Sequence, residues 1–350
     1  MIRKIFNCIS IHNGGGITYL SLMHSELDKE GNLIFLDYRA KNNLKPFIYA
    51  EIKYFKKNIF RNFFVLIERL KKRKMHRIHS KKFDKNEVFS EYYLNGLPPF
   101  IRFPFLKNKT YILFQNRNLF VFQNYFNKKL FFNFNFIVYH VLHSLLINFF
   151  LKRTDTIIVQ TSSMKKIIEN LKPNNNIIIQ DNYWKNLKLK SFIDCIDFKE
   201  SLFAAKEFET IKKISKLNRL FFYPADLSPH KNHKRLFKCF KKITHKNIKL
   251  IVTLDINEVP NKYKSNNQII FLGKQSFRDI HSLYKIVDFL IFPSLNESLG
   301  LPLIESSLYK IPIIASDLDY VYDVCSPFIT FNPFSETDIH SKVLESIKLI

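Results

Sequence analysis

A mostly apolar stretch near the C-terminal end, residues 288–317, constrains the fold of this chain more than any other part of it. Residues 288–292 form an apolar run typical of a buried strand, and residues 311–315 form a second one. Between them lie a short loop and a helix-like segment, in which Pro302 stands where the first helical residue is expected. Strand, loop, helix and strand in this order predict a βαβ unit, and therefore an α/β protein with a parallel sheet.

The loop and the start of that helix have the chemistry of an anion site flanked by carboxylates. Ligands of parallel sheets bind at the carboxyl ends of strands, where the N–H groups of a helix N-terminus are unpaired. Glu297 lies in the loop and Glu305 about one turn into the helix. Carboxylates beside a phosphate site suit a ligand that also carries hydroxyls, such as a nucleotide sugar. The residues expected to line this donor site are Ser298, Leu299, Gly300 and Leu301.

The same residues resemble a known signature. Glu297 and Glu305, seven residues apart and with Gly300-Leu301-Pro302 between them, resemble the E-x7-E motif of retaining GT-B glycosyltransferases, and glycosyltransferase family 4 in particular. The resemblance continues through residues 313–317 and 324–325, covers most of residues 215–350, and extends loosely over the first half of the chain. It implies the GT-B fold, in which two Rossmann-like domains carry parallel sheets that face each other across a cleft.

The resemblance also implies a division of the chain. Residues 1–185 are expected to form an N-terminal acceptor-side domain, and residues 186–335 a C-terminal domain that binds the nucleotide sugar. The chain is expected to cross between the domains from residue 174 to about residue 190. The C-terminal helix, residues 336–350, is expected to pack back on the first domain. The implied reaction moves a hexose from a UDP- or GDP-sugar to a hydroxyl of a bacterial surface polysaccharide or lipid-linked glycan, with retained configuration and without a metal or other cofactor.

Individual roles follow from the motif in the same way. Glu297 is expected to hold hydroxyls of the transferred sugar, and Glu305 the ribose. Lys231 is expected to neutralise the charge that grows on the departing diphosphate, so that Lys231 and Glu297 are the catalytic candidates. The family usually pairs this lysine with an arginine, but Asp226 stands at the arginine position. His230 is a candidate for the missing donor contact.

Glycine is scarce, with 7 in the whole chain, so each one is expected where a positive φ or a close backbone approach requires it. Gly14, Gly15 and Gly16 follow an apolar N-terminal strand, and they predict either a tight turn or a loop that a ligand approaches. The resemblance favours the second reading, with the loop facing the donor, and assigns Gly273 to the nucleotide base. Polar residues at strand ends, namely Asn13, Asn116 and Arg117, are acceptor-side candidates or local loop contacts.

The net charge of +25 reflects in part a composition rich in Lys, Asn, Ile and Phe. Residues 47–85 read as a basic amphipathic helix, which is compatible either with a solvated face or with an anionic membrane surface. Residues 130–151 predict a buried helix, because a membrane span would place several polar groups in lipid. The four scattered cysteines and the absence of an N-terminal signal peptide favour a cytoplasmic protein, with peripheral contact at the inner face of the plasma membrane as an extension.

Two other functions are compatible with these observations. A basic chain can bind nucleic acid, although no nucleic-acid module is visible and the aromatic residues read as buried. A GT-B protein can also bind a sugar nucleotide without transferring the sugar, as a non-catalytic partner subunit. This alternative stays open because Asp226 stands where the family usually has an arginine.

Overall fold

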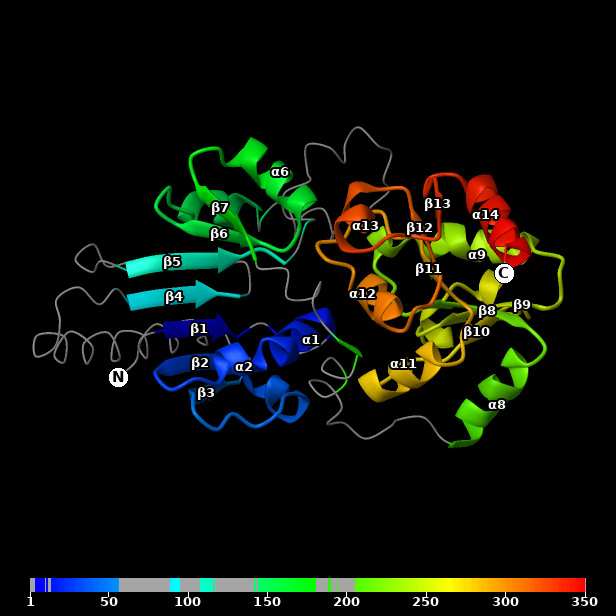
Figure 1. The fold of residues 1–350 in the computed structure, drawn as a ribbon, viewed down its shortest axis with the longest axis horizontal. Coiled ribbons are helices and arrows are strands. Elements are labelled where there is room, and N and C mark those ends of the chain that lie inside the picture. The colour runs from blue at the N-terminus through cyan, green and yellow to red at the C-terminus, as the bar shows by residue number, and fades with distance from the viewer. Residues whose placement is uncertain are drawn as a thin grey trace, which may run out of the picture. The chain divides into compact units, whose positions relative to one another are not determined.

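The structure, a computed structural model, describes residues 4–9, 11, 14–56, 89–94, 108–115, 117, 142, 144–180, 188–189, 193 and 205–349. It divides into two compact units, Met1–Asp181 and Asn182–Ile350. Each unit is built on a sheet whose strand pairs are all parallel (Figure 1). The predicted α/β class with parallel sheets is confirmed.

The first unit contains a seven-stranded sheet with the order β3-β2-β1-β4-β5-β6-β7. Its strands are β1 (Lys4–Cys8), β2 (Asn32–Asp37), β3 (Glu51–Phe55), β4 (Phe89–Tyr93), β5 (Asn108–Leu113), β6 (Thr156–Val159) and β7 (Asn176–Ile179). Its helices are α1 (Gly14–Leu22), α2 (His24–Leu27), the 3-10 turn η1 (Tyr38–Asn43) and α6 (Ser162–Leu171). All six residues of β2 are buried, as expected for a strand covered on both faces.

Local sequence explains how α6 begins. The hydroxyl of Thr161 accepts a hydrogen bond from the backbone N–H of Met164 and so satisfies one of the N–H groups left open at the helix start. Thr161 is thus the N-cap of the helix that follows β6. Buried Met164 and Ile168 then anchor the helix on the strand side.

Three expectations for the first unit were wrong in the part that the structure describes. Residues 51–55 form strand β3 rather than the start of a basic helix, and residues 57–88 lie outside the described ranges. Residues 176–179 form strand β7, where a crossing between domains was predicted. The described helical stretch 144–150 buries Ile147 but exposes Leu145 and Phe149, so this part is not a buried helix. No helix within the described ranges is long and apolar enough to cross a bilayer.

The second unit contains a six-stranded sheet with the order β10-β9-β8-β11-β12-β13. Its strands are β8 (Arg219–Tyr223), β9 (Ile248–Val252), β10 (Ile269–Phe271), β11 (Phe289–Phe292), β12 (Ile313–Ser316) and β13 (Ile329–Phe331). Its helices are α8 (Ala205–Ser215), η4 (Pro229–Lys231), α9 (His233–Lys242), η5 (Ile256–Glu258), α10 (Asn261–Lys264), α11 (Phe277–Tyr284), α12 (Leu301–Leu308), α13 (Asp319–Val324) and α14 (Glu336–Lys348). The order reverses between β8 and β11, as in doubly wound nucleotide-binding sheets.

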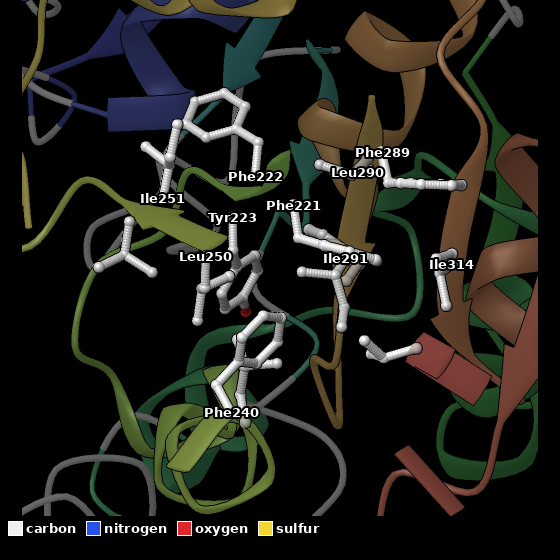
Figure 2. Close-up of a cluster of buried hydrophobic side chains, with 14 of the residues drawn as sticks. Phe221, Phe222, Tyr223, Phe240, Leu250, Ile251, Phe289, Leu290, Ile291 and Ile314 are labelled. Atoms are coloured by element: carbon white, nitrogen blue, oxygen red, sulfur yellow. The ribbon is translucent and has the colours of Figure 1, made fainter. Parts of the chain in front are cut away.

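Aromatic and aliphatic side chains together form the core of the second unit (Figure 2). The rings of Phe221 on β8 and Phe289 on β11 stack with centroids 4.8 Å apart, and Phe240 of α9 meets Phe221 edge-on at 5.7 Å. Burying a phenylalanine stabilises a fold by roughly 1.5–3 kcal/mol relative to leaving it exposed. The core therefore fixes β8 and β11, the two strands from which the site is built.

Helix α14 belongs to the second unit and packs within it. The expectation that it also packs on the first unit stays a prediction. Its buried Ile339 and Val343 are part of the core of the second unit. Lys238 of α9 and Glu336 at the start of α14 form an ion pair with an N–O distance of 2.6 Å, and the two helices lie side by side (Figure 1). The apolar face of α14 is thus used within its own unit.

Candidate functional site

Two loops leave the sheet of the second unit at the point where the strand order reverses. Strand β8 continues into residues 224–232, and strand β11 into residues 293–300. Because β8 and β11 are parallel neighbours, both loops leave from the same carboxyl edge. This edge is where open α/β sheets bind their ligands.

Hydrogen bonds join the two loops into one structure. The hydroxyl of Tyr223, the last residue of β8, donates to the carbonyl of Lys231 and lies 2.9 Å from the Ser294 hydroxyl oxygen. The backbone N–H of Leu295 donates to the carbonyl of His230 at 2.8 Å. The side chain of Tyr223 is fully buried, so these contacts are shielded from water. The loop that carries Lys231 is therefore fixed against the loop that carries Glu297.

Asn232 adds a second connection. Its φ of 61° lies in the left-handed region, which asparagine tolerates better than most residues. Its side-chain amide donates to the carbonyls of Pro293 at 3.1 Å and Pro333 at 2.8 Å, while its side-chain oxygen accepts from Arg235 at 2.9 Å. One buried side chain thus ties the loop after β8 to the loop after β11 and to the turn after β13.

Lys231 and Glu297 meet between these loops. The Lys231 ammonium lies 2.7 Å from Oε1 of Glu297, and the two side chains are only 17% and 11% exposed. Low exposure strengthens the attraction between the charges and makes either charge costly to leave without a partner. An anion that binds here can replace Glu297 as the partner of the Lys231 ammonium. The Glu297 carboxylate is then available to accept hydrogen bonds from hydroxyl groups.

Helix α12 begins beside Glu297. Gly300 is its N-cap with a φ of 70°, a conformation that other residues rarely adopt. A Cβ at this position would lie 3.0 Å from Cδ1 of Leu303. We predicted Pro302 to be the first residue of this helix. The helix starts at Leu301, so Pro302 is its second residue. The first N–H groups of α12 are therefore close in the chain to the Lys231–Glu297 pair, with Ser298 and buried Leu299 between.

Glu305 lies deeper than Glu297, and its carboxyl has a different partner. It is 4% exposed, and its Oε2 accepts a hydrogen bond of 2.8 Å from the hydroxyl of Tyr284 at the end of α11. Burial raises the pKa of Glu305 to about 7, although the Tyr284 hydrogen bond acts in the opposite direction. The two glutamates of the motif are therefore distinct groups, one paired with a cation and one held by a phenol.

The loop after β8 contains further titratable groups. Burial lowers the pKa of His230, so its imidazole is largely neutral near pH 7. Burial acts to raise the pKa of the Asp226 carboxyl, but the Lys231 ammonium and the hydrogen bonds from Ser228 together outweigh this effect and lower that pKa. Burial also lowers the pKa of His233 to about 3, and its ring packs on Tyr223 with centroids 4.9 Å apart. Asp226 therefore brings a negative charge to the loop where the resemblance leads one to expect an arginine.

The other predicted site residues are spread over both units. Gly273 follows β10 with a φ of 69°, and its N–H donates to the carbonyl of Leu254 at 3.0 Å. Gly14, Gly15 and Gly16 form the first turn of α1 in the first unit. Arg117 is 8% exposed, and its guanidinium donates to the Ser163 hydroxyl at 3.3 Å. Asn13 and Asn116 lie outside the described residues.

Among the residues that the structure describes, no group of three or more His, Cys, Asp or Glu side chains is arranged to hold a metal ion.

Four residues that organise the site were not singled out from the sequence: Tyr223, Asn232, Tyr284 and Ser294. The signal for two of them was present, because Tyr223 is a tyrosine at the end of an apolar strand and Asn232 directly follows Lys231. A buried tyrosine hydroxyl needs a partner, and a carboxyl end of a parallel strand is where such a partner matters for a site.

Comparison with known proteins agrees with this geometry. Residues 205–331 match the family described as glycosyl transferases group 1. This segment of the chain is therefore similar to the group 1 glycosyltransferases. The matched segment runs from α8 to β13 and contains Lys231, Glu297 and Glu305.

Individual relatives are more distant. An uncharacterized glycosyltransferase of Methanocaldococcus jannaschii is 30% identical over 181 residues, which are 48% of this chain and 41% of that protein. The O-antigen chain mannosyltransferase RfbU of Salmonella typhimurium is 26% identical over 123 residues, 33% of this chain and 35% of that protein. The matched residues thus span about two fifths or less of these curated relatives.

A solved structure identifies the fold over the whole chain. The crystal structure of Anabaena HepE in complex with UDP and glucose matches with a TM-score of 0.60 at 12% sequence identity, covering 99% of this chain and 90% of that one. Together with the two parallel sheets, this likeness establishes the GT-B fold with two Rossmann-like units.

Proposed function

We propose that the protein transfers a hexose from a nucleotide sugar to a hydroxyl of a glycan acceptor, with the configuration of the sugar retained. The observation that carries the proposal is the Lys231–Glu297 pair, which lies at the carboxyl edge of β8 and β11 beside the start of α12. A cation, a carboxylate and a helix N-terminus are the three groups that a sugar diphosphate can use at once. The group 1 glycosyltransferase match supports this reading.

In this proposal the donor diphosphate replaces Glu297 as the partner of Lys231. The ammonium and the N–H groups at Gly300 and Leu301 then stabilise the negative charge that develops as the diphosphate leaves. Fixed donors aimed at a developing charge each contribute roughly 10²–10³ in rate. They act here without rearrangement, because the hydrogen bonds from Tyr223 and Asn232 already hold the loops.

The two glutamates divide the hydroxyl groups of the donor between them. Glu297, released by Lys231, accepts hydrogen bonds from the transferred sugar. Glu305 accepts from the ribose, and Tyr284 keeps its carboxyl oriented through the 2.8 Å hydrogen bond. Gly273 lies next to the base, and His230 supplies a neutral contact to the phosphates.

The donor and acceptor are proposed from the relatives. HepE was solved with UDP and glucose, and RfbU is described as an O-antigen chain mannosyltransferase. UDP-glucose and GDP-mannose are therefore the donors to try first, since they cover both bases. The acceptor is proposed to be a bacterial surface polysaccharide or a lipid-linked glycan, and the reaction to be cytoplasmic, at or near the inner face of the plasma membrane, and independent of metal.

Donor binding is tested by calorimetry with UDP and GDP. Lys231→Ala should weaken the binding of the preferred nucleotide by about tenfold or more, because a charge-assisted contact to phosphate is lost. Lys234→Ala is the matched control, since Lys234 is an exposed lysine three positions along the chain. If the parent, Lys231→Ala and Glu305→Ala bind the nucleotide with equal affinity, the nucleotide does not bind at this site.

Transfer is tested separately with the donor that binds. Glu297→Ala should lose most of its turnover while it still binds the nucleoside diphosphate, and NMR of the product should show the anomeric configuration of the donor. Unchanged turnover of Glu297→Ala excludes this carboxylate from the reaction, and an inverted product excludes the retaining course.

One observation favours a second candidate function. Asp226 stands close enough to Lys231 for the ammonium to lower the pKa of its carboxyl, so an anion in this loop meets a negative charge as well as a positive one. A sugar-nucleotide-binding protein that does not transfer the sugar, and acts with a partner, is the alternative. Nucleotide binding without donor hydrolysis or transfer, in the presence of a panel of acceptors, would favour it.

A further inference from the structure

The first unit carries two exposed tyrosines, each of which lies beneath a lysine. Tyr38 at the start of η1 is 49% exposed, and Tyr54 on β3 is 38% exposed. The Lys56 ammonium lies 5.6 Å from the centroid of the Tyr38 ring, and the Lys41 ammonium 5.8 Å from that of Tyr54. We call these four residues the tyrosine–lysine quartet. At these distances each cation interacts with a ring face.

The quartet lies at the carboxyl edge of the first sheet. In the ladder of β2 and β3, Leu36 is opposite Tyr54 and Asp37 is opposite Phe55. Tyr38 and Lys56 each follow the last paired residue, so they leave the ladder at the same end. Carboxyl edges of parallel sheets are where such units bind their ligands.

The turn that carries Lys41 is held in place by Asp37. Its carboxylate caps η1 through the N–H of Arg39 and accepts from the Arg39 guanidinium at 2.9 and 2.7 Å. The charge of Arg39 is therefore matched by a carboxylate. By contrast, the ammonium groups of Lys41 and Lys56 have no carboxylate partner among the residues that the structure describes. Within the described ranges, the quartet thus offers two cations without a carboxylate partner beside two aromatic surfaces.

We propose that the tyrosine–lysine quartet is a subsite for an acidic glycan. Tyrosine rings offer rigid apolar faces and a hydroxyl, onto which sugar rings can pack, and the ammonium groups bind carboxylate or phosphate substituents of the same glycan. The assignment of this glycan as the acceptor rests on the proposed glycosyl transfer, whereas the binding does not. A nucleic acid needs a longer track of cations, and a bilayer needs a larger apolar surface.

The inference is tested by calorimetry of the full chain with a hexasaccharide of galacturonic acid and with maltohexaose as the neutral counterpart. The parent should bind the acidic oligosaccharide at least tenfold more tightly. The double variant Lys41→Ala/Lys56→Ala should lose about tenfold in affinity for it, and Tyr54→Ala should also weaken it. The control Lys152→Ala/Lys166→Ala removes the same charge from two exposed lysines near β6 and α6, and should bind like the parent.

UDP and GDP affinities of the quartet variants separate this inference from the proposed donor site, and should equal those of the parent. If the quartet and control variants lose equal affinity for the acidic oligosaccharide, the effect is due to net charge alone, and the inference is overturned. Equal binding of maltohexaose by the parent would overturn it as well. A twelve-residue oligothymidylate that binds as tightly, with the same loss in the quartet variant, would show a general polyanion surface instead.

Discussion

The buried carboxyl of Glu305 makes the stability of the second unit depend on pH in a direction that can be worked out. Burial raises the pKa of this group from 4.5 to about 7. One pKa unit is worth about 1.4 kcal/mol, so the ionised carboxylate destabilises the folded state by about 3 kcal/mol. Below pH 4.5 the group is protonated in both states and contributes no pH dependence.

Between pH 4.5 and 7 the unfolded chain releases this proton while the folded protein keeps it, so stability falls as pH rises. Above pH 7 both states are ionised, and the loss is complete. Glu305→Gln keeps the shape and an acceptor for Tyr284 but cannot ionise. Relative to the parent, it should gain about 3 kcal/mol in the free energy of unfolding between pH 4.5 and pH 8.

The measurement is urea denaturation of parent and Glu305→Gln at several pH values across this range. Taking the difference between the two proteins cancels the other titrating groups. Tyr284→Phe removes the hydrogen bond that favours the ionised form, so its stability should fall more steeply with pH than that of the parent. Parallel pH profiles for parent and Glu305→Gln would show that the carboxyl is not buried as described.

Three further outcomes are expected. Tyr223→Phe removes a buried hydroxyl that contacts the Lys231 carbonyl and Ser294, and it should lower the free energy of unfolding by about 1–3 kcal/mol and weaken UDP or GDP binding; unaltered nucleotide affinity would mean that the loops hold without it. Gly300→Ala forces a strained φ of 70° and a close contact with Leu303, and it should destabilise by about 1 kcal/mol or more in thermal melts; an unchanged melting temperature would show that this position tolerates a side chain. Asp226→Asn removes the negative charge beside Lys231 and should strengthen nucleotide binding severalfold at low salt; a weaker complex would show that Asp226 orients the lysine instead.

The fold of the second unit was predictable from the sequence because its strands are mostly apolar. Strands such as β8 and β11 are buried along nearly their whole length, and periodicity finds them. Strand β3 was missed because Glu51 and Lys53 alternate with apolar residues in a region rich in lysine, and the overall charge pattern favoured a helix. Strand β7 was missed because it is an edge strand that begins at Asn176 and buries only Ile177, so it lacks the apolar run of a central strand.

The site was predictable only in part, and for a physical reason. Glu297, Gly300 and Glu305 lie close together in the sequence, so their spacing can be recognised as a motif. The contacts that position Lys231 join residues far apart in the chain, as in Tyr223 with Ser294 and Asn232 with Pro333. Such contacts depend on which strands are neighbours, which no single stretch of sequence encodes.

The double amide contact of Asn232 has a consequence for how fast this region can respond to a ligand. With the backbone on both sides of Lys231 pinned to its surroundings, an arriving anion meets a loop that is already in its final shape. Only the Lys231 and Glu297 side chains have to turn, so no loop or domain motion on the microsecond-to-millisecond scale is required within this unit. Association should then depend mainly on diffusion and ionic strength.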